Sequence, residues 1–140
     1  MAYDSGNVFA KILRGELPCH KVYEDEATLA FMDIMPQAEC HTLVIPKEGG
    51  EGLLDTPVAS LQAVIATTQK VAAAVKKATG APGVMIAQLN GSEAGQTVFH
   101  LHFHIIPRWA GIDLKFHARG MESPDVLKAN AAKIIAALAR

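Results

Sequence analysis

The chain has few cysteines, no excess of charge of either sign and no long hydrophobic run, and each shortage narrows the class of protein. Its 140 residues contain two isolated cysteines, Cys19 and Cys40, which fits a reducing compartment better than a disulfide framework. The formal net charge is −1, so neither a nucleic-acid partner nor a membrane partner is expected. No apolar run approaches the roughly 20 residues of a membrane span, and residues 1–7 lack the apolar core of a signal peptide. We therefore expect a cytoplasmic protein.

Half of the residues are apolar, which is enough for a core in a single domain spanning residues 1–140. Helix signals lie at 8–13 after Asn7, at 57–79 after Thr56, and at 125–138 after Ser123 and Pro124. Alternating or β-rich segments predict strands over 21–24, 29–34, 41–45, 83–89 and 100–106. Because most strands precede or follow one long helix rather than alternating with helices, we predict an α+β fold with an antiparallel sheet.

The most informative feature is a row of three histidines on alternate residues, His100, His102 and His104, within an apolar segment. In a β-strand these side chains would share one face, and the intervening apolar residues would share the other. Three interpretations follow. The row is a set of solvent-facing strand residues, or a pair of neighbours binds a metal ion, or one imidazole is a catalytic nucleophile.

A glycine-rich polar loop, residues 90–96, leads into the histidine row. A histidine that attacks phosphorus needs hydrogen-bond donors for the phosphate oxygens. The backbone amides of Gly91 and Gly95, and those around Gln96 and Thr97, are candidates for this role. The alternative is an ordinary connection between two strands.

The histidine row and the segments before it resemble the histidine-triad (HIT) family. Residues 95–106 read GQTVFHLHFHII and match the signature His-φ-His-φ-His-φ-φ, in which φ is apolar. Further matching blocks are VFAKILRGELP (8–18), EDEATLAFMDIMPQA (24–38) and HTLVIPK (41–47), so the resemblance covers most of residues 7–108 and is strongest to the bacterial form of the Hint branch. It implies a HIT-like fold, with a five-stranded antiparallel sheet, one long central helix and shorter terminal helices. It also implies a homodimer that pairs through the long helix and a sheet edge.

The resemblance assigns catalytic roles to four histidines. His102 would be the nucleophile that becomes nucleotidylated. The carbonyl of His100 would hold the other ring nitrogen of His102, and His104 would contact the phosphate or the leaving group. His41 matches a fourth family histidine in a supporting position.

The resemblance also assigns a binding site for a purine nucleotide. Asp33 matches the carboxylate that binds both ribose hydroxyls, although it could instead only cap the turn at Met35 and Pro36. Asn90, Gln96 and Thr97 would surround the α-phosphate. The apolar clamp around the base would consist of Phe9, Ile12, Phe31 and Ile34, for which ordinary core packing is the alternative.

The chain departs from the family pattern at some positions, and these departures limit which family properties we expect of it. Relatives with a structural zinc carry a Cys-x-x-Cys pair where this chain has Asn7 and Ala10, so we expect neither metal nor other cofactor. The tail and predicted helix in residues 109–140 match poorly, and in this family the tail often tunes substrate choice. We expect a hydrolase that cleaves purine nucleoside phosphoramidates at the α-phosphorus. The alternatives are a dinucleoside polyphosphate hydrolase using the same His102, and a purine-nucleotide binding or scaffolding protein with little turnover.

Overall fold

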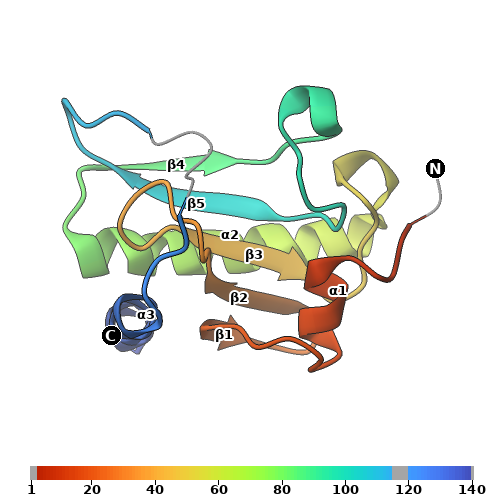
Figure 1. The fold of residues 1–140 in the computed structure, drawn as a ribbon, viewed down its shortest axis with the longest axis horizontal. Helices are drawn as coiled ribbons and strands as arrows, with labels where there is room; N and C mark the ends of the chain where they lie inside the picture. The colour runs from red at the N-terminus through yellow and green to blue at the C-terminus, as the bar shows by residue number, and fades with distance from the viewer. Residues whose placement is uncertain (1–2, 115–119, 140) are drawn as a thin grey trace.

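The computed structural model describes residues 3–114 and 120–139, and its centre is a five-stranded antiparallel sheet (Figure 1). The strands lie in the order β1-β2-β3-β5-β4, so the final strand along the chain is inserted between its two predecessors. Their bounds are β1 (Lys21–Glu24), β2 (Thr28–Met32), β3 (Thr42–Pro46), β4 (Gly83–Ala87) and β5 (Phe103–Arg108). The predicted α+β class with an antiparallel sheet is confirmed.

Helices connect and cover the strands. Asn7 caps the first helix as predicted, because its side chain accepts a hydrogen bond from the Ala10 amide at 2.9 Å. Ser123 caps the last helix in the same way, accepting from the amide of Val126. The α-helices are α1 (Val8–Leu13), α2 (Val58–Thr79) and α3 (Pro124–Leu138), and two 3-10 turns are η1 (Leu53–Asp55) and η2 (Ser92–Ala94).

The two faces of the sheet pack against different helices, because side chains alternate along each strand. Ala30, Met32 and Val44 face the larger core, which includes residues of α2 and α3. The residues on the opposite face form a smaller core with α1: Phe9, Leu29, Phe31, Leu43 and Ile45. His104 of β5 pairs in register with Leu43, so it belongs to the α1 face. The candidate site therefore lies on the face with the smaller core.

The long helix α2 supports the sheet from the other face (Figure 1). Its buried residues include Val64, Val71 and Val75, which pack into the larger core. By length and composition α2 also meets the criterion for a membrane span, contrary to the expectation from the sequence. One side of the helix is occupied by core packing, however, as in the central helix of an α+β domain.

The histidine strand predicted over 100–106 is wrong at its start, since β5 begins at Phe103. His100 and His102 precede the strand in irregular backbone, and only His104 lies within it. Both His100 and His102 are buried, at 1% and 7% exposure, so the row does not face solvent. The two side chains are held by hydrogen bonds of their own rather than by strand alternation.

Other predicted boundaries differ by one or two residues. Strand β2 ends at Met32 rather than at 34, and β4 ends at Ala87 rather than at 89. Thr56 was predicted to cap α2, but this is wrong. Its hydroxyl accepts from the Gly50 amide and donates to the Gly52 carbonyl in the preceding loop, and α2 begins at Val58.

Candidate active site

A pocket of about 570 Å³ opens on the α1 face of the sheet beside the histidines. Two of the triad histidines, His102 and His104, line it. The other residues predicted from the family that line it are Phe9, Ile12, Phe31, Asp33, Ile34 and Thr97. Four predicted residues do not line the pocket: His41, His100, Asn90 and Gln96.

The orientation of His102 is fixed by the backbone of His100. Nδ1 of His102 lies 2.8 Å from the carbonyl oxygen of His100, as the resemblance implied. A carbonyl can only accept, so Nδ1 carries the hydrogen and Nε2 carries a lone pair. The ring of His102 also packs edge-on against Phe9, with centroids 4.9 Å apart. The ring is therefore held as the neutral tautomer that can attack an electrophile through Nε2.

The side chain of His100 anchors that backbone. Its Nε2 lies 2.8 Å from the carbonyl of Pro46 and therefore carries the hydrogen. Its Nδ1 then accepts from the hydroxyl of Tyr3, at 2.6 Å. His100 does not line the pocket, and it positions the carbonyl that holds His102.

His41 directly precedes β3 and forms a hydrogen bond with His104 on the neighbouring strand β5. The Gln37 amide donates to Nδ1 of His41 at 3.0 Å, so Nδ1 carries the lone pair and Nε2 carries the hydrogen. Nε2 of His41 lies 2.9 Å from Nδ1 of His104 and donates to it. His104 is consequently held with its hydrogen on Nε2. One backbone amide thus sets the tautomers of two histidines.

Asp33 uses its two carboxylate oxygens differently. Oδ1 accepts from the Met35 amide at 2.8 Å, which is the turn-capping contact considered above. Oδ2 lies 3.4 Å from Nε2 of His41, and the side chain retains 19% exposure at the pocket. Asp33 therefore caps the turn and also lines the pocket.

Burial sets the protonation of these groups. It lowers the pKa of His102 to about 4, against the opposing effect of the hydrogen bond to His100. It lowers the pKa of His41 to about 3, with neighbouring histidines adding to the effect. Burial also lowers the pKa of His104 and raises the pKa of Asp33 to about 6. His41 is neutral near pH 7, so its 3.4 Å contact with Asp33 is not an ion pair.

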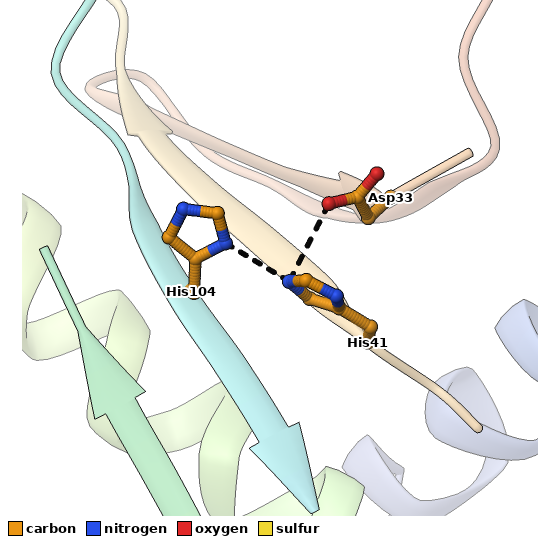
Figure 2. A group of neighbouring side chains, drawn as sticks. All are labelled: Asp33, His41 and His104. Atoms are coloured by element: carbon orange, nitrogen blue, oxygen red, sulfur yellow. Dashed lines mark hydrogen bonds and ion pairs between the residues drawn. The ribbon is translucent and has the colours of Figure 1, made fainter. Parts of the chain in front are cut away.

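Asp33, His41 and His104 lie close enough together to offer three ligand atoms to a metal ion (Figure 2). The donor set is chemically suitable, but the tautomer of His41 opposes coordination. A metal on Nε2 would require the hydrogen of His41 to move to Nδ1, where it would meet the N–H of Gln37. Coordination would therefore cost that hydrogen bond or require an imidazolate.

The loop before the triad is held together by its own polar groups. The side chain of Gln96 donates to the carbonyls of Glu51 and Val98 and accepts from the Gly91 amide. Asn90 Oδ1 accepts from the Leu53 amide and from the side chain of Gln88. Direct phosphate contacts by Asn90 and Gln96 stay predictions.

The backbone amides predicted to face an anion are also used within this loop. The Gly91 amide donates to Gln96, the Gly95 amide donates to the Ser92 carbonyl, and the Gln96 amide donates to the Gly91 carbonyl. The prediction that these three amides bind an anion is therefore wrong for this arrangement. Thr97, the next residue, does line the pocket.

The C-terminal segment supplies pocket residues that the sequence did not predict. Met121, Glu122, Pro124 and Leu127 line the pocket, and the Glu122 amide donates to the Ile34 carbonyl at 2.8 Å. No motif marks these residues, and the only available signal was the cap and proline at Ser123 and Pro124, which predicted α3. A second hollow, about 610 Å³, lies along β1, where Lys21 and Lys47 pair with Glu24 and no histidine is present.

Comparison with known proteins agrees with this geometry. The HIT domain family matches residues 14–111. Adenylylsulfatase HINT3 of Arabidopsis thaliana is 40% identical over 117 residues, which is 79% of this chain and 59% of HINT3. The chain thus spans less than two thirds of that relative's length.

Two solved structures show the same fold. A Hit-like protein from Bartonella henselae, described as involved in cell-cycle regulation, has 52% identity and a TM-score of 0.92, with 97% of this chain and 99% of that chain covered. A hypothetical histidine triad nucleotide-binding protein from Sulfolobus tokodaii has 32% identity and a TM-score of 0.86, with 94% and 91% covered. With the family match over most of its length and the triad at the pocket, this chain belongs to the histidine-triad (HIT) family.

Proposed function

We propose that the protein is a nucleotide hydrolase that cleaves a purine nucleoside phosphoramidate, or a related nucleoside monophosphate derivative, at the α-phosphorus. The observation that carries the proposal is the fixed tautomer of His102: its Nδ1 is held by the His100 carbonyl, which leaves the lone pair on Nε2, and the residue lines the pocket. A neutral imidazole is a nucleophile for phosphorus and also a competent leaving group, so it can divide one difficult displacement into two steps.

In the first step, Nε2 of His102 forms a bond to phosphorus and the bond from phosphorus to the leaving group breaks. The leaving group takes a proton from solvent water as it departs, and the N–H on Nε2 of His104 donates a hydrogen bond that stabilises it. In the second step, water attacks phosphorus, the N–P bond to His102 breaks, and the proton of the attacking water returns to solvent. The nucleoside monophosphate is released and both histidines return to their starting forms.

The nucleotide is proposed to lie with its base in the apolar part of the pocket. Phe9, Ile12, Phe31 and Ile34 provide apolar surface there, and Asp33 stands at the same wall. A carboxylate with 19% exposure beside apolar side chains favours ligands that bring hydrogen-bond donors, such as the two ribose hydroxyls.

Covalent trapping tests the proposal. Intact-mass analysis of enzyme quenched during turnover of adenosine 5′-phosphoramidate should show one nucleotidyl group, located on His102 by peptide mapping. His102→Ala should lose several orders of magnitude in turnover but still bind AMP. An adduct on His100 or His104, or near-normal turnover by the variant, would contradict the assignment.

The leaving group is best addressed with a substrate panel. The relationship to adenylylsulfatase HINT3 makes adenylyl sulfate a second candidate with the same attack at the α-phosphorus. Comparing kcat/KM for adenosine phosphoramidate, adenylyl sulfate and a diadenosine polyphosphate separates the hydrolase classes. AMP binding without turnover of any of them would favour a binding or scaffolding role.

We also propose that the protein is a cytoplasmic homodimer. Val58 and Ile65 of α2 are 68% and 51% exposed, and Ile86 of the edge strand β4 is 44% exposed, so both predicted pairing elements present apolar surface. Light scattering at micromolar concentration should give about twice the 14.9 kDa chain mass. A monomer would contradict this proposal.

A further inference from the structure

His41 stands between the part of the pocket assigned to the sugar and the histidine assigned to the leaving group. Figure 2 shows its ring between Asp33 and His104, with both contacts made through one nitrogen. Nε2 of His41 lies 2.9 Å from Nδ1 of His104 and 3.4 Å from Oδ2 of Asp33. This nitrogen has one hydrogen and two acceptors.

The other ring nitrogen of His41 cannot supply a second hydrogen for these two acceptors. Nδ1 of His41 accepts the Gln37 amide, and the side chain is fully buried, so the ring has no freedom to rotate into solvent. A single N–H forms one well-aligned hydrogen bond, and its strength falls steeply as the angle departs from linear. The two acceptors therefore compete.

We propose that His41 couples recognition of the sugar at Asp33 to the tautomer of His104. The inference rests on the proposed function, because it places the ribose hydroxyls of the bound nucleotide at Asp33. When those hydroxyls donate to the carboxylate, Oδ2 no longer competes for the hydrogen of His41. The N–H of His41 then keeps donating to Nδ1 of His104, and the hydrogen of His104 stays on Nε2, where it can donate to the leaving group.

Without the full set of sugar donors, the hydrogen of His41 shifts toward Asp33. Nδ1 of His104 then loses its donor, and the productive tautomer is no longer enforced. His41 is thus a positioning residue, and the 2′-hydroxyl contributes to the chemical step as well as to binding. A carboxylate that only binds ribose would bind the ground state and the transition state equally and would change KM alone.

Single-turnover kinetics at saturating substrate separate these two cases. For the wild type, the 2′-deoxy substrate should react roughly 2- to 12-fold more slowly, as expected for loss of one neutral hydrogen bond of about 0.5–1.5 kcal/mol. Any further loss of kcat/KM for the 2′-deoxy substrate should appear as a higher half-saturation concentration. Equal maximal rates for the two sugars would overturn the proposal.

Asp33→Asn is the informative variant, because its turn should survive. Oδ1 of the asparagine can keep the Met35 amide, which leaves only the amide nitrogen facing His41, and that nitrogen cannot accept a hydrogen bond. With the competing acceptor removed, the maximal rates for ribose and deoxyribose substrates should become equal, while ribonucleotide binding weakens. Persistence of the rate difference in this variant would overturn the coupling.

Ile12→Ala provides a matched control at the same pocket. Ile12 lines the pocket but has no polar contact with His41, so this variant should weaken binding of both sugars and keep their difference in maximal rate. If it abolished that difference, the coupling would not be specific to Asp33.

Nitrogen-15 NMR of the imidazole rings supplies a readout independent of turnover. With AMP bound, Nδ1 of His104 should give the signal of an unprotonated ring nitrogen, and with 2′-deoxy-AMP it should shift toward a mixture of tautomers. Turnover through His102 with identical spectra would overturn this inference and leave the proposed function intact. A spectral difference without any adduct on His102 would support this inference and contradict the proposed function. Failure to bind AMP would refute both the inference and the proposed function.

Discussion

The hydroxyl of Tyr3 donates to Nδ1 of His100 at 2.6 Å, across 97 residues of sequence. The opposite ring nitrogen of His100 bonds to the carbonyl of Pro46, so the imidazole joins the start of the chain to the end of β3. The backbone carbonyl of the same histidine holds the proposed nucleophile. The N-terminal segment is therefore part of the framework that positions His102.

We expect Tyr3→Phe to lower the free energy of unfolding by about 1 kcal/mol, because Nδ1 of the buried His100 loses its donor while the ring contact is kept. Urea unfolding measures this change. Tyr23→Phe is a matched control, since the Tyr23 hydroxyl donates to Asp25 at the exposed surface, and its effect should stay within about 0.5 kcal/mol. Equal effects of the two substitutions would argue against the buried hydrogen bond.

The rate of nucleotidylation should be insensitive to pH over a wider range than the sequence predicted. An ordinary imidazole titrates near 6.5, but burial lowers the pKa of His102 to about 4. In the Asp33→Asn variant, which lacks the carboxyl that titrates near 6, the single-turnover rate at saturating substrate should therefore be flat from pH 8 to 5 and fall only as the pH approaches 4. A fall centred near pH 6.5 would mean that His102 is more hydrated than in this structure.

Stability should decrease as the solution becomes acidic. His102 and His41 are held neutral in the fold, with pKa values of about 4 and about 3, whereas in the unfolded chain they titrate near 6.5. Below pH 6.5 the unfolded chain binds more protons than the folded protein, so the free energy of unfolding decreases as the pH is lowered. Asp33 has the opposite sign, because its folded pKa of about 6 lies above the unfolded value.

His102 and His41 outweigh the single carboxylate, and the net contribution of these three groups to the loss between pH 7.5 and pH 5 should be on the order of 2–3 kcal/mol. Denaturant unfolding at a series of pH values measures it. His41→Asn should flatten the dependence, because it removes one of the titrating groups. Constant or rising stability on acidification would contradict these assignments.

Catalysis should not depend on a metal ion. By the family resemblance, Asn7 and Ala10 stand where zinc-binding relatives carry cysteines, and the Gln37 amide opposes coordination by His41. Elemental analysis should show no stoichiometric zinc, and a chelator should change the rate little. Zinc near one per chain together with chelator-sensitive turnover would instead support a metal at Asp33, His41 and His104.

The C-terminal segment should contribute to nucleotide affinity. Glu122→Pro removes the amide that donates to the Ile34 carbonyl, whereas Glu122→Ala keeps it. The proline variant should bind AMP roughly 2- to 12-fold more weakly than the alanine variant, by the range for one neutral hydrogen bond. Calorimetric titration measures both. Equal affinities would mean that this hydrogen bond does not contribute to nucleotide binding in the pocket.

The sequence predicted the sheet, the long helix and the site residues that are marked by local patterns. Apolar alternation identified β1, β2 and β3 to within two residues, and Asn7 and Ser123 identified helix starts through their capping side chains. The triad pattern located the pocket, because His102 and His104 lie at its wall.

What could not be predicted depends on contacts between distant residues. Strand β5 begins only at Phe103, and the side chain of His100, before the strand, is held by distant partners, Tyr3 and Pro46. The Glu122 amide reaches the pocket through Ile34, far away in sequence. The protonation of His102 depends on burial, which no local pattern reports.

The pairing of β3 with β5 has a consequence for how the protein acquires its chemistry. The hairpin of β1 and β2, and its neighbour β3, form by pairing between adjacent strands, but the contact between His41 and His104 closes a loop of 63 residues. Loop closure of this kind costs chain entropy that is recovered only when the surrounding structure forms. During synthesis, the hydrogen bond between these histidines cannot exist until β5 has emerged and inserted beside β3. A partly made or partly unfolded chain should therefore be inert toward nucleotides, and recovery of activity should report completion of the fold.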